Sequence, residues 1–306
     1  MATATTSART WRAWGLGFVH GPSQIFFQRN AITGVLILAA FVVADWRMAV
    51  LVLVGAAGGM IGGRLSAYQD ADIAAGRQSF CGALVGAAVF AALGGSAWWS
   101  GALAFAGGIA TGPVTRLVDL LFTRTPLKTY ALPYTTAPFV IVATIIAVST
   151  RPLAVASSSA PGLADPVPAF LVSLLTNVSQ VVLVDSPWAG ALILAGLFVA
   201  GLRVGLAAVL GSVVGSLVSV ALGEPWTVIS SGIENYSGVL TAIALAVAFF
   251  KSSVGSWLYA LPWIVVTAVV TLLMHRLGLD TYTWPYILTT WVALIVAHHL
   301  TGLRRS

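Results

Sequence analysis

Two copies of one sequence pattern run through this chain, and the second follows the first at an offset of 156 residues. The segment SQIFFQRNAITGVLILAA at 23–40 aligns with SQVVLVDSPWAGALILAG at 179–196, and polar residues keep the register together with apolar ones. Near the end of each half a T-x-P-aromatic element recurs, as TAPF at 136–139 and TWPY at 283–286, now at an offset of 147. Chance matching of apolar segments does not readily hold Gln and Thr in register, so we interpret the pattern as an internal duplication.

The composition points to a membrane protein. Of the 306 residues, 58% are hydrophobic and 8% are charged, whereas an ordinary soluble domain has roughly 25% charged residues. The mean hydropathy is +0.96, and a spanning helix needs about 20 mostly apolar residues. We therefore expect an all-α polytopic membrane protein. Basic residues are spread singly, which argues against a nucleic-acid partner, and the single cysteine, Cys81, excludes an intramolecular disulfide or a thiolate metal cluster.

The apolar stretches predict five crossings in each half. They are 32–45, 47–63, 80–96, 99–113 and 133–149 in the first half, and 189–200, 202–221, 238–250, 256–273 and 285–300 in the second. An odd number of crossings inverts the second half relative to the first, and inverted repeats place a substrate site near the midplane between the halves. Each half also opens with a segment too short to span, at 21–28 and at 177–184, which we interpret as a pore-lining half-helix.

We divide the chain into five parts. In order they are a cytoplasmic N-terminal tail (1–17), a first transmembrane repeat (18–150), a Pro/Ser/Ala-rich linker (151–168), a second transmembrane repeat (169–300) and a cytoplasmic C-terminal tail (301–306). Both ends of the chain are basic, and the positive-inside tendency places both in the cytoplasm, which requires an even number of crossings. We expect a multi-pass protein of the inner (cytoplasmic) membrane.

The polar positions that recur are the candidates for a solute pathway. Gln24 and Gln180 lie in the two opening segments, where irregular backbone at membrane depth is tolerated only if it is buried or lines a wet cavity. The alternative is an interfacial turn with the glutamine facing lipid headgroups. Thr136 and Thr283 each precede a proline by two residues, so we expect carbonyls freed by the proline and a threonine hydroxyl to form a row of acceptors. The alternative is an ordinary kink with the threonine bonded to its own helix.

Two aromatic residues recur four positions before a leucine, as Phe80 with Leu84 and Tyr236 with Leu240. This spacing puts each pair on one helix face, where it can form a flat apolar slot. The alternative is ordinary packing against lipid or another helix. Glu234 adjoins a repeated glycine segment and can face the same pathway.

These elements resemble those of the urea transporter family, over about residues 18–300. The resemblance rests on LPYTTAPF at 132–139, TWPY at 283–286, SGVLTAIAL at 237–245 and the paired openings. It identifies the chain as similar to a bacterial member. It implies a homotrimer in which each protomer has its own pore, and passive, channel-like conduction of urea.

The resemblance also implies a filter with two outer sites and a threonine-flanked centre. The implied residues are Gln24, Phe27, Phe80 and Leu84 in the first outer site, Gln180, Leu183, Tyr236 and Leu240 in the second, and Thr136 and Thr283 at the constriction. The chain departs from the family pattern at Cys81 and Ser237, where an Asn is usual, and at Asp280, where a Pro is usual. These departures bear on substrate preference.

The chemistry of urea fits such a pathway. Urea is planar and neutral with four N–H donors and one carbonyl, so apolar walls suit its faces and acceptors replace its bonds to water. We expect the half-helix N-termini to present a positive field that discourages cations. Because acidic residues are absent from the expected span interiors, passive flow is the default hypothesis. Two alternatives stay open: a channel for short amides, ammonia or water on the same scaffold, and an ion-coupled secondary carrier.

An enzyme has no support in the sequence. No Ser/His/Asp set, Walker motif, dinucleotide fingerprint or H-E-x-x-H motif is present. We therefore expect a transport protein with no catalytic residues, no metal and no cofactor, whose partners are the lipid bilayer, urea or a related small amide, and further copies of the same chain.

Overall fold

The structure is a computed structural model that describes residues 2–95, 97–155, 162–279 and 281–306, with side chains from residue 11 onward. The described residues form fourteen α-helices joined by turns and short 3₁₀ segments, which confirms the expected all-α class. The chain divides into two compact units, one of residues 1–121 and 136–157 and the other of residues 122–135 and 158–306. We describe each unit separately.

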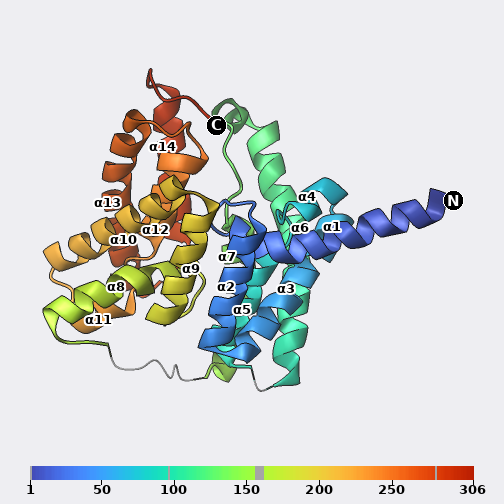
Figure 1. Cartoon of the computed structure of the whole chain (residues 1–306), viewed down its shortest axis with the longest axis horizontal. Helices are drawn as coiled ribbons and strands as arrows, with labels where there is room; N and C mark the ends of the chain where they lie inside the picture. Colours follow the sequence, from blue (N-terminus) through green and yellow to red (C-terminus); the bar gives the residue numbers. More distant parts are fainter. Residues whose placement is uncertain (1, 96, 156–161, 280) are drawn as a thin grey trace. The chain divides into compact units, whose positions relative to one another are not determined.

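The helices of the first unit begin with a long helix that lies crosswise to the next one in Figure 1. In chain order they are α1 (Ala2–Gln24), α2 (Ala31–Ala44), α3 (Trp46–Leu65), α4 (Asp70–Ala74), α5 (Phe80–Leu93), α6 (Trp98–Arg124) and α7 (Ala137–Thr150). The last residues of α6 and the 3₁₀ turn Pro126–Tyr130 belong to the second unit. The backbone of residues 2–17, where we expected a tail, is part of α1.

The second unit has the same order of long and short helices. They are α8 (Pro166–Gln180), α9 (Pro187–Ala200), α10 (Leu202–Ala221), α11 (Trp226–Ser231), α12 (Ser237–Ile243), α13 (Val254–Arg276) and α14 (Trp284–His298). A π-helical turn, Ala244–Ala248, extends α12. Helices therefore form at each of the expected spans of both halves, with ends that differ by a few residues except in α6, which continues to Arg124.

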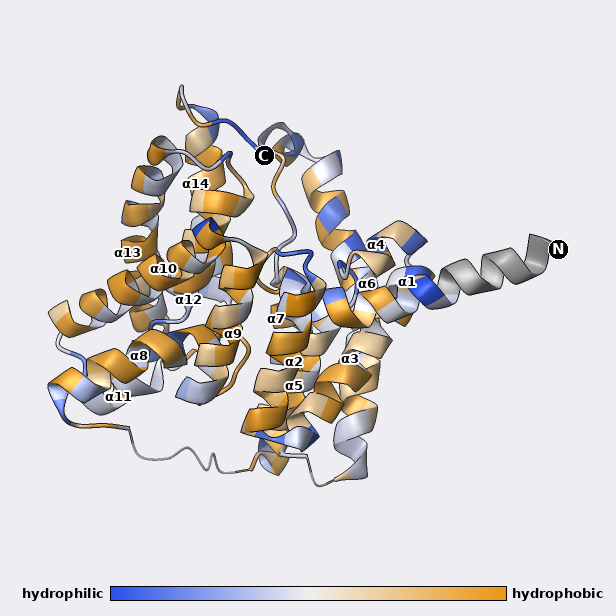
Figure 2. Cartoon of the chain, viewed as in Figure 1, coloured by the Kyte–Doolittle hydropathy of each residue, from blue (hydrophilic) through white to orange (hydrophobic). Residues whose placement is uncertain are grey.

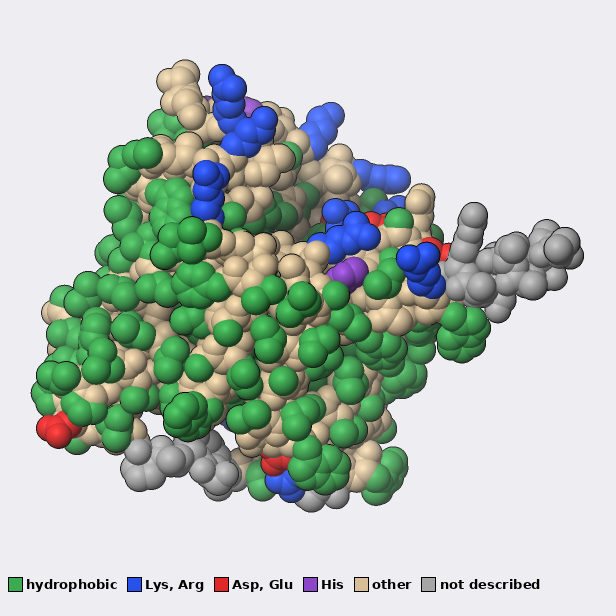
Figure 3. Space-filling view, viewed as in Figure 1, with side chains coloured by type: hydrophobic (Ala, Val, Ile, Leu, Met, Phe, Trp, Pro, Cys, Tyr) green, Lys and Arg blue, Asp and Glu red, His purple; other side chains and the backbone are tan. Residues whose placement is uncertain are grey.

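The surface of the helices is apolar enough for lipid. By length and composition, α3, α10 and α13 can each cross a membrane, and six further apolar helices have 10–17 residues. Hydrophobic residues dominate these helices in Figure 2, and Figure 3 shows hydrophobic side chains over much of the visible surface of each unit. Trp98 is 85% exposed and Trp188 is 75% exposed. Water would not favour such a surface, whereas a bilayer would.

The opening segments are not the half-helices that we expected. Helix α1 ends at Gln24 and α8 ends at Gln180, so each segment starts inside a longer helix and continues into a turn. The reason is local: Phe27 and Leu183 have positive φ values of 62° and 63°, a left-handed conformation that reverses the chain and terminates a helix. Each glutamine therefore lies at the C-terminal end of its helix.

Glycines let the central helices of each unit approach closely. A Cβ atom on Gly55 of α3 would lie 2.2 Å from the carbonyl oxygen of Gly82 in α5. A Cβ atom on Gly211 of α10 would lie 2.4 Å from the carbonyl oxygen of Gly238 in α12. Small residues at helix crossings are the usual way to pack helices in a membrane, where lipid removes the hydrophobic drive for helix association.

Polar side chains cap several of the helices. Asn30 caps α2 by accepting a hydrogen bond from the Thr33 backbone N–H, and Ser186 caps α9 in the same way. Asp45 caps α3 and forms an ion pair with Arg47, with 2.6 Å between Oδ2 and Nη2. The hydrogen bond from the Arg47 side chain lowers the pKa of the Asp45 carboxyl in this loop.

Candidate functional site

The two glutamines are held in the same way. In the first unit, Gln24 Nε2 donates to the backbone oxygen of Ala75 at 2.9 Å. In the second unit, Gln180 Nε2 donates to the backbone oxygen of Ser231 at 3.0 Å. The acceptors, like the glutamines, are related by the offset of 156. Because the amide nitrogen is engaged with the protein, each amide presents its Oε1 as an acceptor for a further N–H donor.

A matched helix ending follows each glutamine. The Gln28 backbone N–H donates to Ser23 O at 3.0 Å, and the Val184 backbone N–H donates to Ser179 O at 3.2 Å. Together with the positive φ of the preceding residue, this is the Schellman arrangement, which usually has Gly at the left-handed position. Phe27 and Leu183 occupy that position here, although a left-handed conformation costs a bulky residue on the order of 1–2 kcal/mol. The turn thus places a large apolar residue three positions after each glutamine.

The aromatic residues follow the loops that the glutamines contact. Phe80 is the first residue of α5, and Tyr236 directly precedes α12. The leucines one turn later, Leu84 and Leu240, are both 0% exposed, and the two aromatic residues are also buried. The structure therefore brings the glutamine and the aromatic–leucine pair of each half into one region of its own unit.

Glycine holds the loop before each aromatic residue against the opening helix. Gly76 and Gly232, which are related by the offset of 156, have φ values of 79° and 74°. A Cβ atom on Gly76 would lie 2.6 Å from the backbone nitrogen of Gly21 in α1. A Cβ atom on Gly232 would lie 2.6 Å from the carbonyl carbon of Thr176 in α8. A side chain at either position would therefore separate the aromatic loop from the glutamine.

The two threonines lie at helix starts. Thr136 directly precedes α7 and Thr283 directly precedes α14, and each is 2% exposed. Neither hydroxyl caps its own helix. Pro138 and Pro285 lie in the first turn, where an N–H is not needed, so the prolines begin these helices instead of kinking them.

In the second half the expected row of freed carbonyls is not found, because Pro285 begins a helix and does not interrupt one. Around the second threonine, Thr281 O accepts from Trp284 N at 2.9 Å and Thr283 O accepts from Ile287 N at 3.1 Å. Between them, Tyr282 O accepts the Tyr236 hydroxyl. These carbonyls are therefore engaged within the protein.

The positive ends of helices lie at the threonines and not at the opening segments. The expectation of a positive field from half-helix N-termini is therefore corrected, since Gln24 and Gln180 are at C-terminal ends. Helices α7 and α14 begin immediately after Thr136 and Thr283, where partial positive charge accumulates on the backbone N–H groups. This field disfavours cations and favours a carbonyl oxygen beside the threonines.

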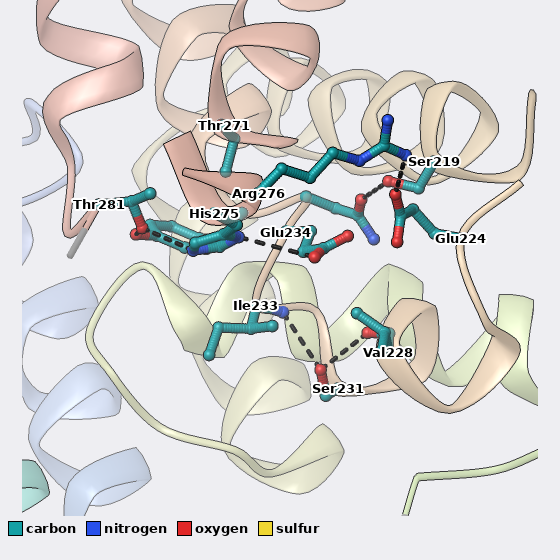
Figure 4. Close-up of polar contacts among 12 residues, drawn as sticks. Ser219, Glu224, Val228, Ser231, Ile233, Glu234, Thr271, His275, Arg276 and Thr281 are labelled. Carbon is teal, nitrogen blue, oxygen red and sulfur yellow. Dashed lines mark hydrogen bonds and ion pairs between the residues drawn. The ribbon is translucent and has the colours of Figure 1, made fainter. Parts of the chain in front are cut away.

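Sequence reasoning missed Thr281 as a polar partner of Tyr236, and it missed the histidine that contacts Thr281. The Thr281 hydroxyl lies 3.4 Å from the Tyr236 hydroxyl, and His275 lies 2.9 Å from Thr281 (Figure 4). The signal was available, since Tyr236 adds a hydroxyl at a position where the first half has Phe80, and a buried hydroxyl needs a partner.

The structure describes two of the three residues that depart from the family pattern. Cys81 and Ser237 are buried in α5 and α12, whereas Asp280 lies outside the described residues. Glu234 lies 3.7 Å from His275 (Figure 4). Among the described residues no group of three or more His, Cys, Asp or Glu side chains could hold a metal ion.

The fold and the matched sets of side chains define a class of protein. Exposed apolar helices make the chain a multi-pass membrane protein, and polar side chains repeated among buried apolar walls are typical of a solute transporter. A family model described as "Urea transporter" matches residues 17–298. The chain therefore belongs to the urea transporter family, whose members are transport proteins and not enzymes.

Individual relatives agree with this assignment. Urea transporter 1 of Rattus norvegicus is 28% identical over 258 residues, covering 82% of this chain and 67% of the rat protein. Urea transporter 1 of Mus musculus is 28% identical over 263 residues, again covering 82% of this chain and 67% of the relative. The Ovis aries protein of the same name is 26% identical over 263 residues with the same coverage.

Proposed function

We propose that this chain conducts urea passively across a bacterial inner membrane, through a pathway to which both halves contribute equivalent residues. The observation that carries the proposal is the matched pair of glutamines. Gln24 and Gln180 each donate a hydrogen bond from the amide nitrogen to a backbone carbonyl, which leaves Oε1 as the acceptor for a solute N–H. Each therefore offers a neutral acceptor beside an aromatic–leucine pair. Family membership supports urea transport, and the matched geometry supports the residues.

The proposed path begins and ends at similar outer sites. Urea enters with its flat faces against Phe80 and Leu84, or against Tyr236 and Leu240, while one N–H donates to a glutamine oxygen. Its N–H groups need acceptors once water is removed, because an unreplaced hydrogen bond costs about 1–3 kcal/mol. Similar sites at both ends lower the barrier to leaving as much as the barrier to entering, which suits passive flow in either direction.

The proposed centre is formed by Thr136 and Thr283. Each hydroxyl can accept from a urea N–H and donate to the urea oxygen, so one residue type serves both ends of the molecule. The helix N-terminus behind each threonine favours the urea oxygen and disfavours cations. Both glutamines are neutral, so neither attracts a cation as a carboxylate in its place would.

We also propose inverted repeats, a homotrimer with one pathway per protomer, and cytoplasmic termini. Matched backbone features support the repeat, since Gln24 and Gln180 end their helices in the same way and hold the same bonds. Five helices at the expected spans of each half support an inverted arrangement, because an odd number reverses the direction of the second copy. The mass of the purified protein in detergent, corrected for bound detergent, tests the trimer.

Stopped-flow swelling of proteoliposomes tests the function. Vesicles with the protein should swell rapidly in urea, more slowly in acetamide, and at the rate of empty vesicles in glycerol. The urea rate should not change when a proton or sodium gradient is imposed. Equal rates for urea and acetamide would favour a general amide channel, water or ammonia flux without urea flux would favour the other channel alternatives, and dependence on a gradient would favour a coupled carrier.

A further inference from the structure

In the second unit a row of polar contacts runs from Glu234 to Tyr236. Glu234 Oε1 lies 3.7 Å from His275 Nδ1, and His275 Nε2 lies 2.9 Å from Thr281 Oγ1 (Figure 4). Thr281 Oγ1 lies 3.4 Å from the Tyr236 hydroxyl, which donates to the backbone oxygen of Tyr282. This row of contacts thus joins an acid–histidine pair to an aromatic wall of the proposed pathway.

One end of this row of contacts is more accessible than the other. The side chains of His275 and Glu234 are 23% and 13% exposed, whereas Tyr236 and Thr281 are 3% and 5% exposed. His275 and Glu234 therefore form the accessible end of these contacts, while the hydroxyl contacts stay buried. A change of charge at the accessible end can be passed inward through hydrogen bonds.

The protonation state of His275 decides whether Thr281 can donate a hydrogen bond to Tyr236. Tyr236 uses its one hydrogen on Tyr282 O, so its oxygen can still accept a hydrogen bond from Thr281. If His275 Nε2 carries a proton, it donates to Thr281, and the threonine hydrogen is left for Tyr236. If Nε2 is bare, it accepts the threonine hydrogen, and Tyr236 loses that donor. Protonated His275 carries a hydrogen on both ring nitrogens, whereas a neutral ring has one, and the Glu234 carboxylate near Nδ1 favours its placement on Nδ1, which leaves Nε2 bare.

The surrounding charges leave Glu234 as the acid beside His275 within the described part of the chain. Arg276, the next residue of α13, is paired with Glu224 at 2.6 Å (Figure 4). Glu224 comes from the turn after α10, and Asp280 lies outside the described residues. Glu234 is therefore the acid that faces the His275 ring.

The first half of the protein folds without an equivalent row of polar contacts. The offset of 156 pairs Glu234, Tyr236 and His275 with Gln78, Phe80 and Asp119. Phe80 has no hydroxyl, and Asp119 accepts a hydrogen bond from the Tyr68 hydroxyl instead. Because the same helices form in both units, the architecture does not need the contacts that end on Tyr236.

We propose that His275 and Glu234 are positioning residues that set the Tyr236 wall and, through Tyr282, the turn that carries Thr283. With protonated His275 the Tyr236 hydroxyl has two hydrogen bonds, one from Thr281 and one to Tyr282 O, whereas a neutral ring with its hydrogen on Nδ1 removes the first, so that the Tyr236 ring is held less firmly. The inference rests on the proposed function, because it gives Tyr236 and Thr283 a role in conducting urea. A fixed slot rejects wider amides better than a loose one, so the flux ratio of urea to acetamide should be higher in acid.

The test measures both fluxes in proteoliposomes with equal pH on both sides, from about pH 5.5 to about pH 8.5, the range in which histidine ordinarily changes charge. We expect the urea-to-acetamide ratio of the wild type to fall by about 2- to 10-fold as pH rises, the effect of one hydrogen bond. His275→Gln keeps an N–H donor at every pH, so its ratio should stay at the acidic value. Thr281→Val and Glu234→Gln test the other contacts, and the ratio should become independent of pH in Thr281→Val.

Matched controls separate this histidine from the others. The chain has four histidines, so a variant with His20, His298 and His299 replaced by Gln should keep the wild-type pH profile. Tyr236→Phe, which copies Phe80, should lose the pH dependence whatever its absolute flux. A wild-type ratio that does not change with pH, or a Thr281→Val or Tyr236→Phe protein that keeps the change, would overturn the inference while leaving urea conduction intact. A wild-type protein that conducts no urea would overturn the proposed function and this inference together.

Discussion

Replacing Thr136 by valine isolates one hydroxyl at the proposed centre. Valine has nearly the same shape, and the threonine hydroxyl does not cap α7, so the helix keeps its start. The Thr136 carbonyl is already engaged, because it accepts from Val140 N at 3.1 Å. The hydroxyl is therefore the group that the substitution removes from the proposed path of urea.

The expected loss of urea flux follows from the burial of Thr136. Thr136 is 2% exposed, so water cannot readily replace the lost partner. A buried hydrogen-bond partner lost from the path costs on the order of 1–3 kcal/mol. If the cost falls on the highest barrier, urea flux should drop by about 5- to 150-fold, since 1.4 kcal/mol is about tenfold. Thr283→Val should behave alike, and the double variant should lose less than the product of the two effects because both act on one narrow segment.

The assay is stopped-flow swelling in urea, normalised to the amount of protein in the vesicles. Thr115→Val is the matched control, because that buried hydroxyl donates to Thr111 O at 2.7 Å within α6 and takes no part in the proposed path. Its flux should stay near the wild-type value. A Thr136→Val protein that keeps the wild-type melting temperature and the wild-type urea flux would refute the reasoning and move the centre of the pathway elsewhere.

Three further predictions test the aromatic slot, the helix packing and the topology. Phe80→Ala should admit acetamide relative to urea while the protein stays folded and keeps its oligomeric mass; unchanged selectivity would return Phe80 to ordinary packing. Gly34→Ala should lower thermal stability in detergent, by about 1–3 kcal/mol or more, because its Cβ atom would lie 1.7 Å from Val19 O, whereas Gly101→Ala has nothing within 4 Å and should be neutral. In a Cys81→Ser background, single cysteines placed at the two termini should react with an impermeant label from the same side of the membrane, and reaction from opposite sides would contradict the proposed ten crossings.

The positions of the helices could be read from the sequence, because long apolar stretches have few other options in a membrane. Even there, hydropathy gave the wrong length for α6, which continues past its apolar part to Arg124. The opening segments were misjudged for a different reason. Their helices end at Gln24 and Gln180 because bulky residues adopt positive φ, and sequence patterns lead one to expect Gly at such a position.

The candidate site was predictable only in part. The repeat singled out both glutamines, both threonines and both aromatic–leucine pairs, and within each unit the structure brings the glutamine to the loop before the aromatic residue. The pairing of His275 with Thr281 and Glu234 could not be read from the repeat, since the first half has no histidine at that position. Features that the two copies share are visible in one sequence, whereas features that belong to one copy need coordinates.

Backbone strain recurs beside the proposed pathway residues of both halves. Phe27 and Leu183 have φ values of 62° and 63°, and Thr135 and Tyr282, which precede the two threonines, have values of 52° and 38°. Glycine would adopt these conformations at lower cost, so strain of on the order of 1–3 kcal/mol at each position persists only where the surroundings or the function require a side chain. At 27 and 183 the helix ending needs the left-handed backbone, while the proposed outer site needs a large apolar side chain. Positive φ values in matched positions therefore support the internal repeat, and they do so from the backbone, independently of which side chains a solute would touch.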